Sequence, residues 1–187
     1  NPVTRQIYTN TFYRKPAILG RPSNSRIILS TKFVNKIPEG KRKVILPSPF
    51  SLVYLSDGIH RNENGAIKNE IFSEVLLNVA EILNIEAKRL AKESKISFIQ
   101  FNEPCMAYAK ETEYFWDGIT ESLSIVTKNL KIITSLHLYN GDSSRFLPKL
   151  EDLPVQRIGM DVYTTNLIKF LGIGFKKFLE AGVINSK

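Results

Sequence analysis

Short segments rich in β-branched residues alternate with longer helical patterns along most of this chain. Strands are predicted at residues 26–34, 43–46, 96–101, 131–137, 157–161 and 181–185. Helices are predicted between them, at residues 66–91, 113–129, 146–150 and 167–179. In the longest helix, apolar residues recur at the spacing of one helix face. Because strands that alternate with helices pair in parallel through right-handed crossovers, the pattern predicts an α/β fold.

The length of the chain bears on which α/β architecture to expect. A doubly wound sheet and a (β/α)8 barrel both fit the alternation, but no predicted strand is followed by a G-x-G-x-x-G fingerprint or a P-loop. A complete barrel usually needs roughly 250 residues, and this chain has 187. No repeat or long linker divides it. We therefore expect one truncated domain over residues 1–187, a partial TIM-type (β/α)8 barrel.

Polar side chains gather where the predicted strands end. Ser48 follows one strand, and Glu103, His137 and Asp161 end or follow three others. Barrel enzymes keep their catalytic residues at the carboxyl ends of strands, so these last three are expected to converge on one mouth. The candidate substrate-binding residues are Asn102, Glu103, His137, Asp161 and Asn185.

The positive charge of the chain is concentrated near its N-terminus. The formal net charge is +8, and residues 1–45 hold ten lysines and arginines but one acid, Glu39. Such a basic lead-in, over residues 1–42, suits phosphates, polycarboxylates or nucleic acid. A solvated basic surface without a ligand explains the same composition equally well.

Composition also bears on compartment and on individual residues. The single cysteine, Cys105, cannot form an internal disulfide and is expected to be a small buried hydrophobe. No apolar stretch approaches the ~20 residues that span a bilayer, and no signal-like core is present, so we expect a soluble, cytoplasmic protein. His60 is expected in a solvated loop, and the aromatic residues 114–116 in the core.

Four short motifs occur in a distinctive order. Residues 43–50 read K-V-I-L-P-S-P-F, and residues 99–105 read I-Q-F-N-E-P-C. Residues 134–141 read T-S-L-H-L-Y-N-G, and residues 181–185 read A-G-V-I-N. They resemble the K-x-x-L-x-G-P-x-T/S, I-Q-I-D-E-P-A, H-x-C-Y-G and G-V-V-D/N segments of the cobalamin-independent methionine synthases. Residues 9–14 match the family's T-N-Y-x-Y segment only weakly.

The resemblance implies a (β/α)8 barrel and a methyl transfer in methionine biosynthesis. In that family, a zinc-bound homocysteine thiolate attacks the methyl group of a methyltetrahydrofolate-polyglutamate or, in some short relatives, of methylcobalamin. Zinc suits this chemistry because it keeps the thiol deprotonated near neutral pH.

The chain departs from the family pattern at the residues that would bind zinc. His137 stands where the metal-binding histidine would be, but Tyr139 replaces the cysteine two residues later. The family's glutamate ligand falls near Asp161, and Asn102 replaces the aspartate of the I-D-E-P motif. A zinc site needs three or four ligands. We therefore predict no metal ligands and no catalysis by this chain alone, and expect zinc only in its catalytic relatives.

These losses are similar to those of the N-terminal barrel in full-length family members, which lacks the metal ligands and helps to bind the glutamate tail of the folate. The expected partners are therefore a folate polyglutamate or another anionic ligand, which the basic lead-in would attract, and a separate catalytic barrel chain. No membrane partner is expected.

The alternative is a basic nucleic-acid-binding protein. Tyr8, Phe12 and Tyr13 interleave with the basic residues of the lead-in, and bases stack on aromatic rings while cations meet phosphates. The sequence contains no RRM, KH or helix-turn-helix pattern, which argues against this alternative.

Overall fold

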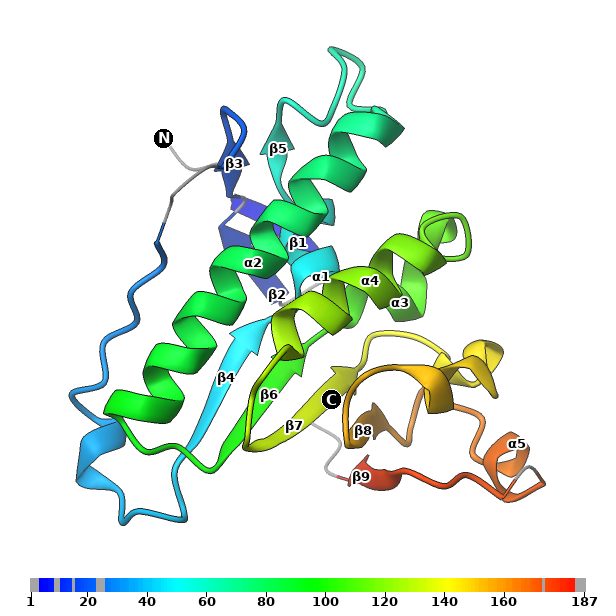
Figure 1. Cartoon of the computed structure of the whole chain (residues 1–187). Helices are drawn as coiled ribbons and strands as arrows, with labels where there is room; N and C mark the ends of the chain where they lie inside the picture. The colour runs from blue at the N-terminus through cyan, green and yellow to red at the C-terminus, as the bar shows by residue number, and fades with distance from the viewer. Residues whose placement is uncertain (1–3, 9–10, 15, 23–25, 173, 184–187) are drawn as a thin grey trace.

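The computed structural model describes residues 4–8, 11–14, 16–22, 26–172 and 174–183 (Figure 1). Its largest sheet has five strands in the order β4-β6-β7-β8-β9, and every neighbouring pair is parallel. The strands are β4 (Lys43–Pro47), β6 (Phe98–Asn102), β7 (Ile133–Leu138), β8 (Arg157–Asp161) and β9 (Phe178–Gly182). The predicted α/β class and the parallel pairing are confirmed.

Helices cover one face of this sheet (Figure 1). They include α1 (Pro49–Tyr54), α2 (Asn69–Glu93), α3 (Pro104–Tyr108) and α4 (Trp116–Thr127), while the short α5 (Ile168–Leu171) lies beyond the ends of β8 and β9. Helix α2 packs against α1 and α4, and its apolar stripe, which includes Phe72, Leu76 and Leu83, is buried. The long helices expected at residues 66–91 and 113–129 are therefore confirmed, with each start shifted by a few residues.

Alternation along each strand separates a buried apolar face from a second face of mixed polar and apolar residues, which also includes Ile45 and Ile133. Phe101 and Leu136 point into the core beneath the helices and are fully buried. In the described part of the chain, no helix covers the other face (Figure 1). We call this second surface the open face; its central residues are Lys43, Phe98, Gln100, Asn102, Ser135, His137, Arg157, Gly159, Phe178 and Glu180.

The strand predicted at residues 26–34 is wrong. Residues 26–31 run as an extended segment without a ladder partner among the described residues, and a turn at residues 32–33 leads into the single turn η1 (Val34–Lys36). Ile27 and Leu29 are half-buried against the core. The alternation of the sequence is therefore real, but a helix rather than a neighbouring strand buries the alternate side chains.

The helix predicted at residues 167–179 is mostly wrong, because only α5 forms there. Gly172 and Gly174 follow it, and Gly174 has a φ of +62°. This left-handed backbone is typical of the residues that end helices. The last strand consequently begins earlier than predicted, at Phe178, and Asn185 lies outside the described residues.

The helix predicted at residues 146–150 is replaced by two short 3-10 turns, η3 (Ser143–Phe146) and η4 (Lys149–Asp152). Pro148 lies between them. Proline has no backbone N–H to donate, so a continuous helix cannot pass through this position.

Smaller elements surround the main sheet. The antiparallel pair β1 (Thr4–Tyr8) and β2 (Thr11–Arg14) precedes the parallel pair of β3 (Ala17–Ile18) with β5 (Asp57–Gly58), and η2 (Lys110–Thr112) links α3 to α4. Within the described ranges, the helices are too short or too polar to cross a membrane.

Candidate functional site

The carboxyl ends of β6, β7 and β8 lie along one edge of the sheet. Asn102 and His137 are neighbours in register, and the N–H of Glu103 donates to the carbonyl oxygen of His137 at 2.8 Å. Asp161 ends the next strand. Its carboxylate accepts hydrogen bonds from Tyr163 N at 2.9 Å and from Thr164 Oγ1 at 3.0 Å, within its own turn. The structure thus places these residues at one edge, without a described contact between the side chains of Glu103, His137 and Asp161.

Glu103 is directed into the protein interior and has no exposed surface. It caps α3, where Oε1 accepts from Met106 N at 3.1 Å, and Oε2 accepts from Ser51 N at 3.1 Å. The Ser51 hydroxyl also donates to this carboxylate and itself accepts from Cys105 N at 3.0 Å. Burial raises the pKa of Glu103. The carboxylate therefore joins α1 to α3, and its contact with a substrate stays a prediction.

Cys105 and most of the aromatic cluster behave as the sequence predicts, but Tyr114 is 68% exposed and lies outside the core. Cys105 is buried, and burial raises the pKa of its thiol to about 12, which leaves it protonated at neutral pH. Phe115 is a core residue, and Trp116 stacks on Phe146 with ring centroids 5.2 Å apart.

The solvated-loop prediction for His60 is wrong, because this residue is fully buried. Its ring lies edge-on to Phe72 with centroids 5.9 Å apart, and Nε2 lies 3.2 Å from the Ser56 carbonyl oxygen. Burial lowers the pKa of His60, which favours the neutral imidazole. The sequence does not indicate this packing against α2, because polar residues follow His60.

The open face carries a polar network centred on Glu180 of β9. Its Oε2 lies 2.5 Å from His137 Nε2 and accepts from Ser135 Oγ at 3.0 Å, while Oε1 lies 3.4 Å from Arg157 Nη1. Partial burial opposes ionisation of this carboxyl, but the hydrogen bonds from His137 and Ser135 outweigh it and lower the pKa of Glu180. The network therefore holds a charged carboxylate against the sheet.

Gly159 makes this contact possible. In register, His137, Gly159 and Glu180 are neighbours across β7, β8 and β9. A Cβ atom at residue 159 would lie only 2.4 Å from His137 Nε2. The imidazole therefore reaches across β8 to Glu180 only because residue 159 has no side chain.

Cations and aromatic rings alternate beside this network. Lys43 Nζ lies 4.5 Å from the centroid of the Phe98 ring, and Arg157 Cζ lies 5.3 Å from the centroids of both Phe98 and Phe178. Attraction between a cation and the face of an aromatic ring stabilises such stacks. Two cations thus stand on the open face, where an anionic group could meet them.

Sequence reasoning missed Glu180, Arg157 and Ser135. Glu180 fell between a predicted helix and a predicted strand, so its alternation with Phe178 and Gly182 along β9 went unused. An alignment of the strands in register would have found all three, because they share a face with His137.

Zinc does not fit the residues that the structure describes. Among them, no group of three or more histidine, cysteine, aspartate or glutamate side chains is placed to hold a metal ion. His137 contacts Glu180, and the Asp161 carboxylate accepts a hydrogen bond within its own turn. Residue 139 is a tyrosine, which cannot supply a thiolate ligand.

The sequence was compared with known proteins. The model of the family described as "cobalamin-independent synthase, N-terminal domain" matches residues 3–187, almost the whole chain. The chain belongs to this cobalamin-independent synthase family. No curated protein matches the sequence.

Among solved structures, this chain is similar to a B12-independent methionine synthase from Shewanella sp. W3-18-1, determined in complex with selenomethionine. The TM-score is 0.60 at 21% sequence identity, and the match covers 76% of this chain. It covers only 44% of the Shewanella chain, so the matched part is less than half of that protein. This likeness supports the fold: the parallel sheet and its helices correspond to a partial TIM-barrel-like unit, whose five described strands do not close into a barrel.

Proposed function

We propose that this chain supplies the metal-free, N-terminal barrel portion of a cobalamin-independent methionine synthase, and that it binds the anionic tail of the methyl donor. The observation that carries the proposal is the match of the N-terminal-domain family model to residues 3–187. In the proposed reaction, a methyl group moves from a methyltetrahydrofolate-polyglutamate, or from methylcobalamin, to the sulfur of homocysteine. The metal-dependent part of this reaction is assigned to a separate catalytic barrel chain.

The open face offers chemistry that suits a polycarboxylate. Arg157 makes one 3.4 Å contact with Glu180 through Nη1, so its other N–H groups are available to a ligand. Lys43 is exposed at the start of β4, beside the same Phe98 ring. Guanidinium and ammonium groups bind carboxylates through charge-assisted hydrogen bonds. His137 and Asn102 lie one row further along the sheet and extend this surface towards the carboxyl edge.

A longer glutamate tail is expected to bind more tightly. Methyltetrahydrofolate with three glutamates should bind the chain roughly tenfold more tightly than the monoglutamate, because one further ion pair contributes about 1.4 kcal/mol. Isothermal titration calorimetry with both ligands measures this difference. Lys43→Met should remove most of it, whereas Lys110→Met, at an exposed residue of η2, should leave it unchanged. Equal affinities for the two ligands would contradict the proposed tail site.

The purified chain is also expected to hold well under one zinc ion and to transfer no methyl group to homocysteine by itself. The reason is the ligand count, since a weakly held ion with two protein ligands is lost on purification. Metal analysis of protein prepared without chelators measures the content. One tightly bound zinc ion per chain that is lost in the His137→Ala variant would contradict the metal-free assignment.

A further inference from the structure

Basic residues gather at the amino ends of the strands, the edge opposite to Glu103, His137 and Asp161. Because β4, β6 and β7 are parallel, the segments that lead into them meet at this edge. These segments hold eight lysines and arginines against two carboxylates, in residues 34–43, 92–97 and 128–132. The segments that follow the same strands hold four basic residues against six acids, in residues 48–68, 103–115 and 139–146. Positive charge is therefore segregated to one edge of the sheet.

Hydrogen bonds fasten these segments to one another. Arg42 donates to the carbonyl oxygens of Ile37 at 2.6 Å and of Ser94 at 2.8 Å. Ser97 N donates to the carbonyl oxygen of Arg42 at 3.0 Å, and Ile133 N donates to that of Ser97 at 3.1 Å. Arg42 thus uses its donors within the protein, and the three segments form one joined platform.

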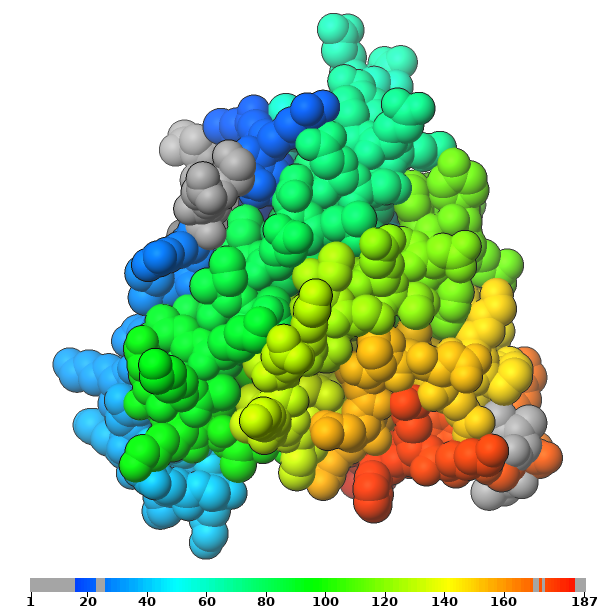
Figure 2. Space-filling model, in the orientation of Figure 1, coloured from blue at the N-terminus to red at the C-terminus, as the bar shows by residue number. Residues whose placement is uncertain are grey.

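Six exposed lysines stand on this platform, and we call them the basal rim: Lys36, Lys41, Lys92, Lys95, Lys128 and Lys131. Neighbouring strands lie about 4.8 Å apart, so three adjacent strand ends span roughly 10 Å. The spacing of neighbouring strand ends is shorter than the Debye length of about 8 Å at physiological ionic strength, so the fields of lysines on neighbouring segments overlap. In Figure 2, the segment before β4 and the end of α2 form one continuous surface at the lower left.

The carboxylates at this edge are already occupied. Glu39 pairs with Lys95 at 2.9 Å, and Glu93 pairs with Arg89 at 2.8 Å. The other five lysines of the rim form no ion pair within the described parts of the chain. The rim therefore retains an excess of positive charge.

Stabilisation of the helices explains the positions of only some of the rim lysines. Lys92 and Lys128 lie at the C-terminal ends of α2 and α4, where a cation complements the helix dipole. Lys36, Lys41 and Lys131 lie outside these helices. Their shared position on one edge points to an external anion.

An exposed aromatic ring accompanies the lysines. The Phe33 side chain precedes η1 with 74% of its surface exposed, and Lys36 Nζ lies 5.7 Å from its ring centroid. Proteins that bind single-stranded nucleic acid combine lysines for the phosphates with aromatic rings on which bases stack. An anionic membrane would instead favour a long amphipathic helix, and η1 is a single turn.

We infer that the basal rim, together with Phe33, binds single-stranded RNA without sequence preference. The phosphates contact the lysines of the three segments, and one base stacks on Phe33. The rim leaves out Lys43 and Arg157, on which the proposed tail site depends, so the variants below test the two surfaces with different residues.

Salt dependence provides the test. A fluorescein-labelled oligouridylate of about twelve nucleotides should bind the full chain in a saturable way at about 50 mM salt. Five phosphate contacts give a slope of log affinity against log salt of about −3.5, which corresponds to a loss of roughly hundredfold between about 50 and 200 mM. Fluorescence anisotropy measures both quantities. Absence of saturable binding at low salt overturns the inference.

Matched variants locate the surface. The triple variant Lys92→Ala, Lys128→Ala and Lys131→Ala should reduce the slope by about 2 units. Phe33→Ala should weaken binding roughly tenfold and leave the slope unchanged, because stacking involves no counterion release. The control carries Lys68→Ala, Lys110→Ala and Lys169→Ala, which are exposed elsewhere, and should bind like the unaltered chain.

Two results would overturn the assignment. If the rim variant and the control lose binding equally, the affinity for RNA depends only on the net charge of the chain, and the rim is not a binding site. If vesicles of phosphatidylserine and phosphatidylcholine bind through the rim while the oligouridylate does not, the partner is a lipid surface.

Discussion

Replacement of Glu103 by alanine is expected to lower the free energy of unfolding at neutral pH by about 3 kcal/mol. The variant would leave Ser51 N and Met106 N buried without an acceptor, and each such group contributes roughly 1 to 3 kcal/mol of destabilisation. Glu103→Gln should destabilise less than Glu103→Ala, because its amide oxygen can accept from one of the two N–H groups, while its NH2 group leaves the other without an acceptor. Urea denaturation measures both variants, and Glu113→Ala, at an exposed glutamate nearby, is the control with an effect below about 0.5 kcal/mol.

Urea denaturation should also show that the free energy of unfolding depends on pH, and the raised pKa of Glu103 determines the direction of that dependence. Burial raises the pKa of Glu103 above its ordinary value of 4.5, so the folded state binds more protons than the unfolded state above that pH. The free energy of unfolding should therefore fall as the pH rises from 4.5 towards the raised pKa. Glu103→Gln should lack this component. An identical pH profile for the two proteins would show that the carboxyl is not desolvated.

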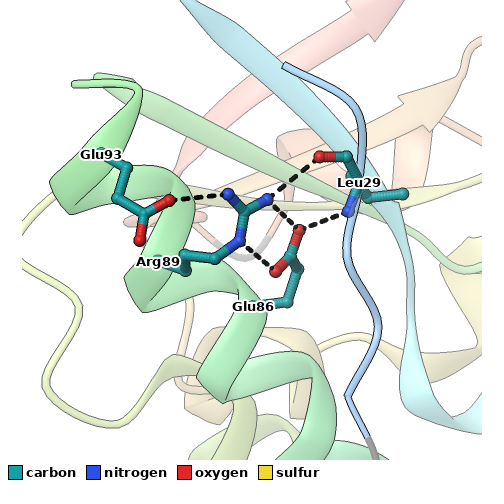
Figure 3. Close-up of polar contacts among 4 residues, drawn as sticks. All are labelled: Leu29, Glu86, Arg89 and Glu93. Carbon is teal, nitrogen blue, oxygen red and sulfur yellow. Dashed lines mark hydrogen bonds and ion pairs between the residues drawn. The ribbon is translucent and has the colours of Figure 1, made fainter.

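Replacement of Glu86 by alanine is expected to lower the free energy of unfolding by about 2 kcal/mol and to release the extended segment 26–31 from α2. Figure 3 shows the contacts involved: Glu86 Oε1 accepts from Leu29 N at 2.7 Å, and Arg89 Nη2 donates to the Leu29 carbonyl oxygen at 3.0 Å. Arg89 also binds both carboxylate oxygens of Glu86. Hydrogen bonds to charged groups contribute roughly 1.5 to 3 kcal/mol. Loss of amide protection at Leu29, followed by hydrogen exchange, measures the release.

Glu93→Ala is the matched control for this contact. Glu93 binds the same arginine, but its side chain is 57% exposed and does not reach the segment. An exposed pair of this kind contributes little, so the control should stay within about 0.5 kcal/mol and keep the protection of Leu29. Equal exchange at Leu29 in both variants would argue that Glu86 does not fasten the segment.

The sequence predicts the sheet well where the burial pattern is local. Residues 157–161 form β8 with the predicted bounds, and the helical spacing of residues 66–91 anticipates α2. The prediction fails for residues 26–34, because alternation reports that alternate side chains are buried but not what buries them. It also fails around Gly172 and Gly174, where apolar spacing suggests a helix that the backbone ends after α5.

The same distinction between local and non-local features applies to the candidate site. Asn102, His137 and Asp161 could be placed at one edge because parallel strands align their carboxyl ends. The direction of each side chain could not be predicted, since Glu103 turns inward to cap α3 while His137 faces the open surface. The partnership of His137 with Glu180 depends on register and on the absence of a side chain at residue 159, neither of which is local in sequence.

Strand β9 has a consequence for the stability of this network. Among the described strands it lies at the edge of the sheet, and its residues are exposed towards both surfaces: Phe178 by 71% and Leu179 by 43%. Segments with little buried apolar surface open locally, with less free energy than global unfolding requires. Local opening of β9 would take Glu180 out of the sheet and separate its carboxylate from His137 and Arg157 while the rest of the molecule stays folded. A ligand whose carboxylate replaces that of Glu180 beside these two residues would therefore draw β9 towards the open form.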